Sequence, residues 1–400
     1  MSEPTKVAYI GCGGITGAHL KGFADLHGRG WRGMAVTACC DLNQASAAQR
    51  AQEFADVQGS PPQVFTNVEA LLAADVAEAA IITVPHWLHH SVAIAALKAG
   101  LHVMVEKPIG ITVKASKKII AAGKKAGRVV ATAEQVRRLP SCRAFRWAIA
   151  EKKMIGEVRA VHTSQVMNNP LDLSKPAMRW RAVKLLTGGG MIMDSGAHYA
   201  DMMQHMFGEP DTVYCVTRNH DGRIVENAPT LGNVPADVET AWHAMIHFHS
   251  GIDVVWLYSR HYYGAPAQVA QYFGTHGTIR SDKIAFHPFQ GGGTIFFADG
   301  REMNTEQVVA EYMASLSADQ KERLFPLGCE NAFGIQTWDF IEAIRQKRPP
   351  EMDGEAGLRA KTLSEACFES AEAGKPVKYA DVLSGRTRAF QKPIDAHWGI

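Results

Sequence analysis

The sequence lacks a strong excess of either charge, because 42 Lys and Arg residues are set against 40 Asp and Glu residues. A net charge of +2 excludes the basic surface of a typical nucleic-acid-binding protein and the polybasic run of a membrane-surface protein. An uncharged apolar run of ~20 residues, which a membrane-spanning helix needs, is also missing. We therefore expect neither a nucleic acid nor a membrane as a partner.

Cysteine is scarce, odd in number and scattered, with no C-x-x-C pair among Cys12, Cys39, Cys40, Cys142, Cys215, Cys329 and Cys367. This spacing supports neither a disulfide framework nor a structural zinc site. The amino terminus enters a strand pattern without the charged segment and apolar stretch of a secretory signal. These features favour a protein of the reducing cytoplasm.

The composition is that of an ordinary folded protein, with 46% hydrophobic and 20% charged residues. At roughly 100–200 residues per domain, this length predicts two or three domains. In the first third, strand-like runs alternate with helical segments such as 46–54, 91–99 and 114–126; the runs are 6–10, 34–39, 79–84, 102–105 and 128–131. This alternation predicts a doubly wound parallel α/β sheet of the Rossmann type over residues 1–135.

Beyond residue 135 the pattern changes to long strand-like runs separated only by turns, at 159–166, 212–217, 240–248 and 252–258. Strands joined by turns predict an α+β domain with a large, open, mostly antiparallel sheet over residues 136–400. Helical patterns return at 334–347 and 357–372.

A glycine-rich loop follows the first predicted strand, Gly11-Cys-Gly-Gly-Ile-Thr-Gly17, and leads into a helix. Gly11 permits a tight turn, and Gly13 lets the backbone approach a pyrophosphate at the start of the helix. Thr16 replaces the third glycine of the usual pattern. The strand before the loop and the helix after it predict a dinucleotide site.

Asp41 ends the second predicted strand, 41 − 11 = 30 residues after Gly11, whereas the usual spacing is about 20. A carboxylate here would accept hydrogen bonds from the ribose hydroxyls and repel a 2′-phosphate, which favours NAD over NADP. A helix cap or a turn residue is the alternative interpretation of Asp41.

Two further segments follow predicted strands: Thr83-Val-Pro-His86-Trp-Leu-His89-His90 and Glu106-Lys107-Pro108. Ligands bind at the carboxyl ends of strands in open α/β sheets, so the Lys107 ammonium is a candidate to face the nicotinamide. A solvated turn lysine is the alternative.

The second domain contains Gly188-Gly-Gly190 followed by Asp194-x-x-x-His198. On a helix, Asp194 and His198 would share one face. A histidine there could take a hydroxyl proton, with the carboxylate fixing its tautomer, and the glycines would allow close approach to a cofactor. Alternatively, Asp194 caps a helix and His198 lies in the core.

Together, the glycine loop, Asp41, the Thr83–His89 loop, Glu106-Lys-Pro108 and Asp194-x-x-x-His198 resemble the Gfo/Idh/MocA oxidoreductases. The similarity extends to Tyr272–Ile279 and the 340–344 helix, and so covers almost the whole chain. This resemblance implies an NAD-dependent enzyme with a polyhydroxylated substrate on the second domain, assembled as a homodimer or homotetramer through its open sheet.

The resemblance also implies roles for individual residues. Lys107 and His198 would flank the reacting C–OH, with His198 as acid/base and Asp194 supporting it. Cofactor contacts would come from Gly11, Gly13, Gly14, Ile15, Asp41, Thr83, Pro85, His86, His89, Glu106, Lys107 and Gln135. Substrate contacts would come from Lys107, Arg179, Trp180, Arg181, Asp194 and His198.

The segment from Met178 to Lys184 carries cations beside Trp180, a pattern suited to a sugar acid or a sulfonated sugar. Alternatively, Trp180 and Arg181 pack on the cofactor. His243, His247 and His249 share strand parity, but no nearby carboxylate or cysteine completes a metal site, and we assign them to an oligomer-facing surface and expect no metal.

Three functions remain open at this level. The leading one is hydride transfer between NAD and a secondary alcohol of a sugar, polyol or glycoside. The second is an NAD-dependent glycoside hydrolase that oxidises C3 transiently and uses Glu134, His86 or Tyr199 as a further base. The third, a cofactor-binding sensor, is disfavoured by the set of Lys107, Asp194 and His198.

Overall fold

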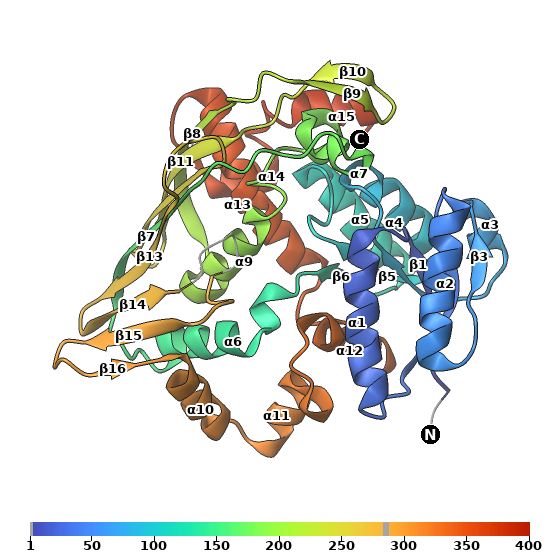
Figure 1. The fold of residues 1–400 in the computed structure, drawn as a ribbon, viewed down its shortest axis with the longest axis horizontal. Helices are drawn as coiled ribbons and strands as arrows, with labels where there is room; N and C mark the ends of the chain where they lie inside the picture. Colours follow the sequence, from blue (N-terminus) through green and yellow to red (C-terminus); the bar gives the residue numbers. More distant parts are fainter. Residues whose placement is uncertain (1–2, 283–287) are drawn as a thin grey trace. The chain divides into compact units, whose positions relative to one another are not determined.

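The computed structural model describes residues 3–282 and 288–400. Contacts divide the chain into two compact units. Unit 1 comprises the residues up to Gly110 with Ala115–Arg138 and Ser317–Leu358, and unit 2 comprises Ile111–Lys114, Leu139–Leu316 and Arg359–Ile400. Figure 1 draws the ribbon with colours that follow the sequence.

Unit 1 is built on a parallel six-stranded sheet in the order β3-β2-β1-β4-β5-β6. The strands are β1 (Thr5–Ile10), β2 (Met34–Cys40), β3 (Gln63–Phe65), β4 (Ala79–Ile82), β5 (His102–Glu106) and β6 (Val130–Ala133). The winding direction reverses between β1 and β4, so right-handed crossovers place helices on both faces. The prediction of a doubly wound sheet is confirmed, and only the short, largely exposed β3 was missed.

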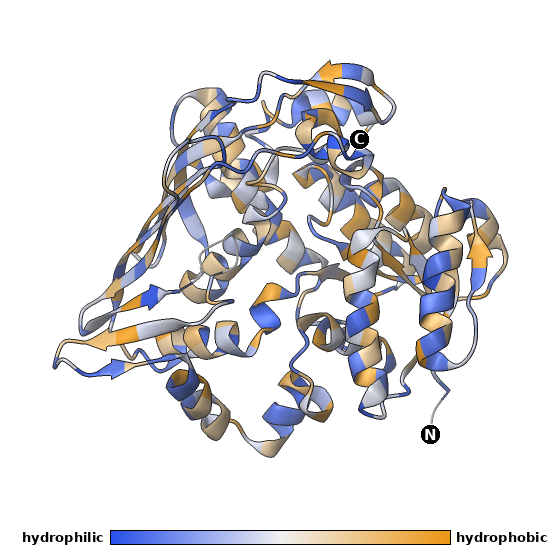
Figure 2. Ribbon diagram, viewed as in Figure 1, coloured by the Kyte–Doolittle hydropathy of each residue, from blue (hydrophilic) through white to orange (hydrophobic). Residues whose placement is uncertain are grey.

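The helices of unit 1 are α1 (Gly14–Gly28), α2 (Gln44–Gln58), α3 (Val68–Ala73), α4 (His89–Lys98), most of α5 (Val113–Ala126), α11 (Ala318–Leu324) and α12 (Ala332–Arg345). The central strands β1 and β4 are buried almost throughout, as expected for a sheet covered on both faces. Figure 2 shows α1 and α2 with mixed hydrophilic and hydrophobic colouring, as expected of helices with one face on a sheet.

Helix α12 belongs to unit 1 although it lies far along the chain. A Cβ on Gly22 of α1 would come within 2.4 Å of the backbone nitrogen of Gly334, so both helices need glycine where they cross. The sequence pattern placed residues 136–400 together in the second domain, whereas the structure returns residues 317–358 to unit 1. Helical periodicity identifies a helix but does not say which sheet it packs against.

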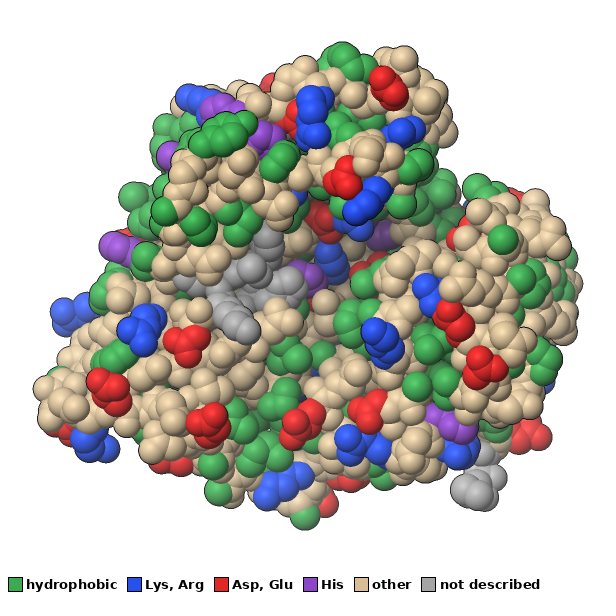
Figure 3. Space-filling model, viewed as in Figure 1, with side chains coloured by type: hydrophobic (Ala, Val, Ile, Leu, Met, Phe, Trp, Pro, Cys, Tyr) green, Lys and Arg blue, Asp and Glu red, His purple; other side chains and the backbone are tan. Residues whose placement is uncertain are grey.

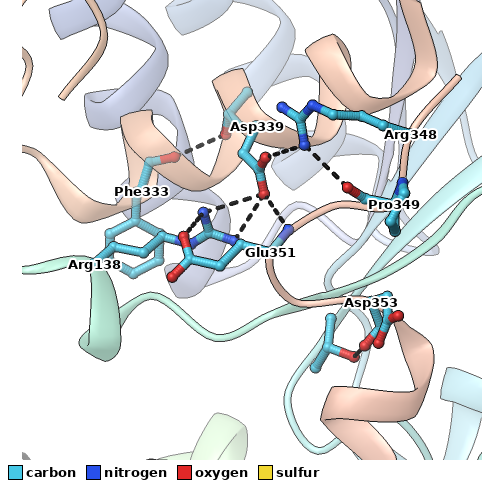
Figure 4. A network of polar contacts seen from close by, with 9 residues as sticks. Arg138, Phe333, Asp339, Arg348, Pro349, Glu351 and Asp353 are labelled. Atoms are coloured by element: carbon cyan, nitrogen blue, oxygen red, sulfur yellow. Dashed lines mark hydrogen bonds and ion pairs between the residues drawn. The ribbon is translucent and has the colours of Figure 1, made fainter. Parts of the chain in front are cut away.

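An ion-pair network joins three separate segments of unit 1 (Figure 4). Arg138 lies 3.3 Å from Asp339 and 3.1 Å from Glu351, while Arg348 lies 2.8 Å from the other oxygen of Asp339. The backbone N–H of Glu351 also donates to Asp339 at 2.8 Å. Two cations and two carboxylates thus compensate one another and fix α12 to the end of β6.

Unit 2 contains a nine-stranded sheet in the order β16-β15-β14-β13-β7-β12-β11-β8-β17. The strands are β7 (Val158–Val166), β8 (Pro210–Arg218), β11 (Ala241–Phe248), β12 (Asp253–Ser259), β13 (Ala267–Gly274), β14 (Gly277–Ser281), β15 (Gly293–Phe297), β16 (Glu302–Met303) and β17 (Val377–Lys378). All neighbours are antiparallel except β7 and β12. This confirms the predicted large, mostly antiparallel sheet. A separate ribbon pairs β9 (Ile224–Ala228) with β10 (Gly232–Pro235).

The helices of unit 2 lie towards one face of this sheet in Figure 1. They are α6 (Pro140–Arg146), α7 (Pro176–Arg179), α8 (Lys184–Thr187), α9 (Gly196–Phe207), α10 (Thr305–Ser315), most of α13 (Gly354–Ala373), α14 (Tyr379–Ser384) and α15 (Lys392–Trp398). On one row across the sheet, Met245 pairs in register with Tyr214 and Val255. These three side chains are 56%, 43% and 37% exposed, so this face carries an apolar row.

Among the described helices, none combines the length and the apolar character needed to cross a bilayer. Figure 3 shows acidic and basic side chains interspersed on the face it presents, in keeping with the near-neutral net charge.

Candidate functional site

The glycine loop of unit 1 connects β1 to α1. Gly11 has a φ of +96°, and a Cβ there would lie 2.6 Å from the carbonyl carbon of Thr83, so both its conformation and its packing require glycine. At Gly13 and Gly14, by contrast, a Cβ would meet nothing within 4 Å. Helix α1 begins with no side-chain cap at Gly13, which leaves its first N–H groups available to an anion.

Thr16 replaces the third glycine without disturbing the loop. Its hydroxyl is buried and donates to the carbonyl of Gly11 at 2.9 Å, and the Thr83 hydroxyl donates to the same oxygen at 2.6 Å. Thr83, which we predicted to contact a cofactor, therefore directs its side-chain oxygen into the loop. Its contribution is to fix the loop's shape against the end of β4.

Asp41 links the glycine loop to the start of α2. One carboxylate oxygen accepts a hydrogen bond from the N–H of Cys12 at 2.8 Å, and the other accepts from the N–H of Asn43 at 2.8 Å. Asn43, not Asp41, caps α2. Each carboxylate oxygen can accept more than one hydrogen bond, so Asp41 can also bind a ribose diol.

Glu106 at the end of β5 faces inward. Nε2 of His19 on α1 donates to its Oε1 at 2.8 Å, and the N–H of Lys107 donates to its Oε2 at 3.1 Å. His19 and Glu106 are both buried. Glu106, predicted to line the cofactor, thus ties β5 to α1 and holds the backbone of the half-buried Lys107.

His89 is also buried rather than open at this edge of the sheet. Its ring nitrogens each lie 2.8 Å from a carbonyl oxygen, one from Val84 and one from Pro108, and burial lowers its pKa. His89 therefore joins the loop after β4 to the loop after β5. Pro85 precedes the 3₁₀ turn of His86–Leu88, in which His86 is buried with its ring 5.5 Å from that of His89.

In unit 2, Asp194 lies in the turn that precedes α9, and the buried His198 lies in the first turn of that helix. The interpretation that places both residues on one face of a helix is therefore wrong, because Asp194 precedes α9. The turn is nevertheless wound tightly, with hydrogen bonds from the Asp194 N–H to the Gly190 carbonyl and from the Gly196 N–H to the Met191 carbonyl. The Asp194 carboxylate forms an ion pair with Arg181. This pair places a cation beside the acidic candidate, which the sequence did not indicate.

The three glycines before this turn serve packing inside unit 2. A Cβ on Gly188 would lie 2.6 Å from the Ile111 carbonyl oxygen, and one on Gly190 would lie 2.7 Å from Glu239. The Glu239 carboxylate accepts hydrogen bonds from the N–H groups of Gly190 and Ile192 at 2.6 Å and 2.9 Å. Close approach to other parts of unit 2 is sufficient to require glycine at Gly188 and Gly190.

The candidate substrate residues at 179–181 differ in placement. Trp180 is buried, and the Arg181 guanidinium lies 4.6 Å from the centre of its ring. Arg179 donates from Nε to the Leu173 carbonyl at 3.1 Å. Only Arg181 of these three lines a hollow of unit 2, which it shares with Asp194 and Glu239.

Comparison with known families decides the identity of the fold. The pattern described as "Oxidoreductase family, NAD-binding Rossmann fold" matches residues 5–134, and "Oxidoreductase family, C-terminal alpha/beta domain" matches residues 148–379. The chain belongs to the Gfo/Idh/MocA family of oxidoreductases. The predicted resemblance and the predicted NAD-binding domain are thereby confirmed.

Individual relatives are distant but extend over most of the chain. The chain is 26% identical to 1,5-anhydro-D-fructose reductase of Ensifer adhaerens over 331 residues, 83% of this chain and 88% of that protein. It is 24% identical to D-glucoside 3-dehydrogenase of Escherichia coli over 385 residues, 94% and 98% of the two chains. A solved structure of levoglucosan dehydrogenase with NADH and L-sorbose shares the fold, with a TM-score of 0.76, 22% identity and coverage of 94% of this chain and 99% of that one.

The Gfo/Idh/MocA loop in this chain fits NAD on four observations. These are the open Cβ positions at Gly13 and Gly14, the uncapped α1, the accepting oxygens of Asp41 and the 38% exposure of the apolar Ile15. In addition, the buried Oε1 of Gln135 has no hydrogen-bond donor among the described residues, so a bound ligand could supply one.

Arg50 of α2 is a neighbour of this loop that the sequence did not reveal. Its guanidinium pairs with Glu53 and donates to the Gly13 carbonyl at 3.2 Å. A cation in this region could attract a 2′-phosphate, but Glu53 offsets its charge. No motif marks Arg50, because its position depends on how α2 packs beside the loop.

The three residues considered as a further base are held in other roles. Oε1 of Glu134 accepts from the N–H of Val136 at 3.0 Å, and His86 is buried beside His89. The Tyr199 hydroxyl lies 3.2 Å from that of Tyr272, and burial raises its pKa. Tyr199 is therefore a residue of the unit 2 core.

The strand histidines are not grouped. His243 and His247 are exposed on the face of β11 that carries Met245, and Nδ1 of His247 lies 2.8 Å from Asp253. His249 follows the strand and lies 3.9 Å from Asp211. In the part of the chain that the structure describes, no group of three His, Cys, Asp or Glu residues could hold a metal.

Proposed function

We propose that this oxidoreductase is an NAD-dependent dehydrogenase that oxidises a secondary alcohol of a sugar, polyol or glycoside. The observation that carries the proposal is the NAD-binding loop of unit 1, in which Asp41 lies beside an uncapped helix start. The relatives named as a reductase or dehydrogenase of sugars and glycosides support the substrate class.

In this proposal, each candidate residue has one task. Lys107 donates a hydrogen bond to the substrate oxygen, and an imidazole nitrogen of His198 accepts the hydroxyl proton. Asp194 stabilises the protonated imidazole, while its ion pair with Arg181 limits how far the carboxylate can move. Bound NAD would accept the hydride from the same carbon.

NAD reduction tests this function against the redox-neutral alternative. The purified protein is given NAD with neutral sugars, polyols, uronic acids and aryl glycosides, while NADH and released aglycone are measured in parallel. NADH that accumulates in step with oxidised product supports the dehydrogenase. Aglycone release without net NADH would instead identify an NAD-dependent glycosidase.

The proposed ribose contact predicts a change of cofactor preference. Asp41→Ala removes the carboxylate that would repel a 2′-phosphate, so kcat/KM with NADP rises relative to that with NAD. The ratio is measured with one substrate, and Glu69→Ala, which alters a carboxylate of α3, serves as the control. A variant that still excludes NADP would refute this role for Asp41.

We further propose that the chain forms a homo-oligomer through the face that carries Tyr214, Met245 and Val255, because an exposed apolar row of this kind is suited to self-association. Light scattering after gel filtration should give a dimer or tetramer for the wild type and a smaller species for Met245→Asp. An unchanged mass in the variant would exclude this face.

All seven cysteines are free, which supports a cytoplasmic location.

A further inference from the structure

A hollow in unit 2 carries more charge than the proposed chemistry uses. About 360 Å³ of space, open solvent included, lies among its lining residues. Its wall contains Arg181 and Asp194 from the candidate site, three apolar residues and a second set of charged groups; the lining includes Leu171, Met191, Val238, Asp221, Glu239 and Arg260. A molecule whose alcohol lies at Asp194 would therefore also meet these groups.

Arg260 is held rigidly in this wall, directly after β12. Its backbone N–H donates to the Thr240 carbonyl at 3.0 Å, and its own carbonyl accepts from the N–H of Asn169 at 2.8 Å. The side chain is fixed as well, because Nε donates to the Asn169 carbonyl at 2.8 Å. Arg260 is only 7% exposed, so its guanidinium is a largely desolvated cation.

The carboxylates around the hollow are already engaged elsewhere. Asp194 pairs with Arg181, and Asp221 receives two hydrogen bonds of 2.7 Å from Arg223. Glu239 accepts the two backbone N–H groups of the glycine turn. Among the described residues, none places a carboxylate within ion-pair distance of Arg260, and its terminal nitrogens have no hydrogen-bond acceptor.

A buried cation without a paired anion is costly, and a ligand that supplies the anion removes that cost. The planar guanidinium offers two parallel N–H donors, which match the two oxygens of a carboxylate. The apolar part of the wall limits water and so strengthens the contact. A bare hydroxyl would satisfy one donor but leave the charge uncompensated.

We propose that Arg260 is a specificity residue that binds the carboxylate of an acidic carbohydrate, such as a uronic acid, whose alcohol is oxidised beside Asp194. This inference rests on the proposed dehydrogenase function, whose substrate class it narrows. It assigns the anion to Arg260, which no sequence motif marks, and not to Arg179, which does not line this hollow.

The test compares each acid with its neutral counterpart in the same protein. NADH formation gives kcat/KM for D-glucuronate beside D-glucose and for D-galacturonate beside D-galactose, with the acid methyl esters and D-glucose 6-phosphate as further probes. The variants are Arg260→Gln, Arg260→Lys and Arg301→Gln, the last removing an exposed arginine from the same unit. A ratio measured within one variant does not depend on the fraction that is folded.

For the wild type we expect one acid to exceed its neutral partner and its ester by about 10- to 100-fold in kcat/KM, the range for a charge-assisted hydrogen bond. Arg260→Gln should abolish this preference mainly through KM, Arg260→Lys should retain part of it, and Arg301→Gln should leave it unchanged. A wild type that prefers the neutral sugars or the phosphorylated sugar, or an Arg260→Gln variant that keeps the preference, overturns the inference.

Calorimetric titration of the same acids into the NADH-loaded protein separates this inference from the proposed function. Arg260-dependent binding of an acid that is never oxidised would leave Arg260 as the anion site and refute the dehydrogenase. Oxidation of neutral sugars without any acid preference would support the dehydrogenase function and refute Arg260 as the anion site. Absence of Arg260-dependent binding for every acid overturns the inference.

Discussion

Two buried arginines, one in each unit, have opposite surroundings. Arg138 is 2% exposed and lies within 3.3 Å of Asp339 and within 3.1 Å of Glu351 (Figure 4). Arg260 is 7% exposed, but among the described residues its side chain has a single hydrogen bond, from Nε to a backbone carbonyl. Both side chains lose most of their hydration on folding, yet among the described residues only Arg138 has carboxylates within ion-pair distance, while Asp194, Glu239 and Asp221 act on Arg260 from farther away.

This difference separates a structural network from a binding site. The carboxylates around Arg138 join α12 to the segment after β6, and both lie within ion-pair distance of the Arg138 guanidinium without a ligand. The carboxylates of Asp194, Asp221 and Glu239 act on Arg260 through their charge but are hydrogen-bonded to other groups, so the terminal N–H donors of Arg260 stay available to an added acceptor. Burial of a charge by itself does not indicate function, whereas burial without a partner beside an open hollow does.

The largest expected effect is a loss of stability when the ion-pair network around Arg138 is broken. Asp339→Ala leaves Arg138 and Arg348 facing each other without the shared carboxylate, and we expect a loss of about 3–5 kcal/mol in the free energy of unfolding. Urea unfolding followed by circular dichroism measures it. Asp299→Ala, which removes an exposed carboxylate paired with Arg301, is the control and should leave the midpoint unchanged. Equal midpoints for the two variants would contradict the importance of the network.

Glu239 should make the free energy of unfolding depend on pH, an effect of intermediate size. Burial raises its pKa from 4.5 to about 7, so the folded protein binds this proton more tightly than the unfolded chain does. Its stabilising contribution is full below pH ~4.5 and is lost as the pH rises through about 7, a change of about 3 kcal/mol for this group.

Glu239→Gln isolates this effect, because it removes the titrating group. The decline in the free energy of unfolding between pH 5 and pH 7.5 should be smaller in the variant than in the wild type, whatever the offset between the two curves. Parallel curves would show that Glu239 does not titrate in this range.

The smallest expected effect distinguishes the two arginines directly. Arg260→Met removes an unpaired buried cation, so the relief of desolvation offsets the lost hydrogen bond and the free energy of unfolding changes by less than ~1 kcal/mol. Arg138→Met removes the cation that Asp339 and Glu351 share and should cost several times more. A loss at Arg260 as large as that at Arg138 would mean that Arg260 is part of the structure rather than a ligand site.

The fold was largely predictable because its local patterns are strong. Apolar runs such as Ala79–Ile82 and the alternation along β11 specify a buried parallel strand and a half-buried antiparallel one. The return of α12 to unit 1 was not predictable, because it depends on a glycine contact between Gly22 and Gly334 that lie more than three hundred residues apart. Periodicity records local structure and not the partner of each face.

The site was predictable only where backbone geometry demands a residue type. Gly11 requires glycine in any protein with this turn, and Asp41 follows from the strand end. The direction of the side chains was harder to predict from the sequence. Glu106 and His89 face inward, and Gly190 packs on Glu239. No sequence motif marks Arg260, because its proposed role depends on the hydrogen bonds that the surrounding carboxylates form with other groups.

The central claim, hydride transfer assisted by His198, is tested most directly by NADH formation in the wild type and His198→Ala. His205→Ala on the same helix serves as the control, and NADH binding is measured by fluorescence in all three proteins. We predict that turnover falls by ~10²–10⁴-fold only in His198→Ala, with NADH affinity retained. Undiminished NADH formation by His198→Ala, or substrate cleavage without NADH in the wild type, would contradict the account.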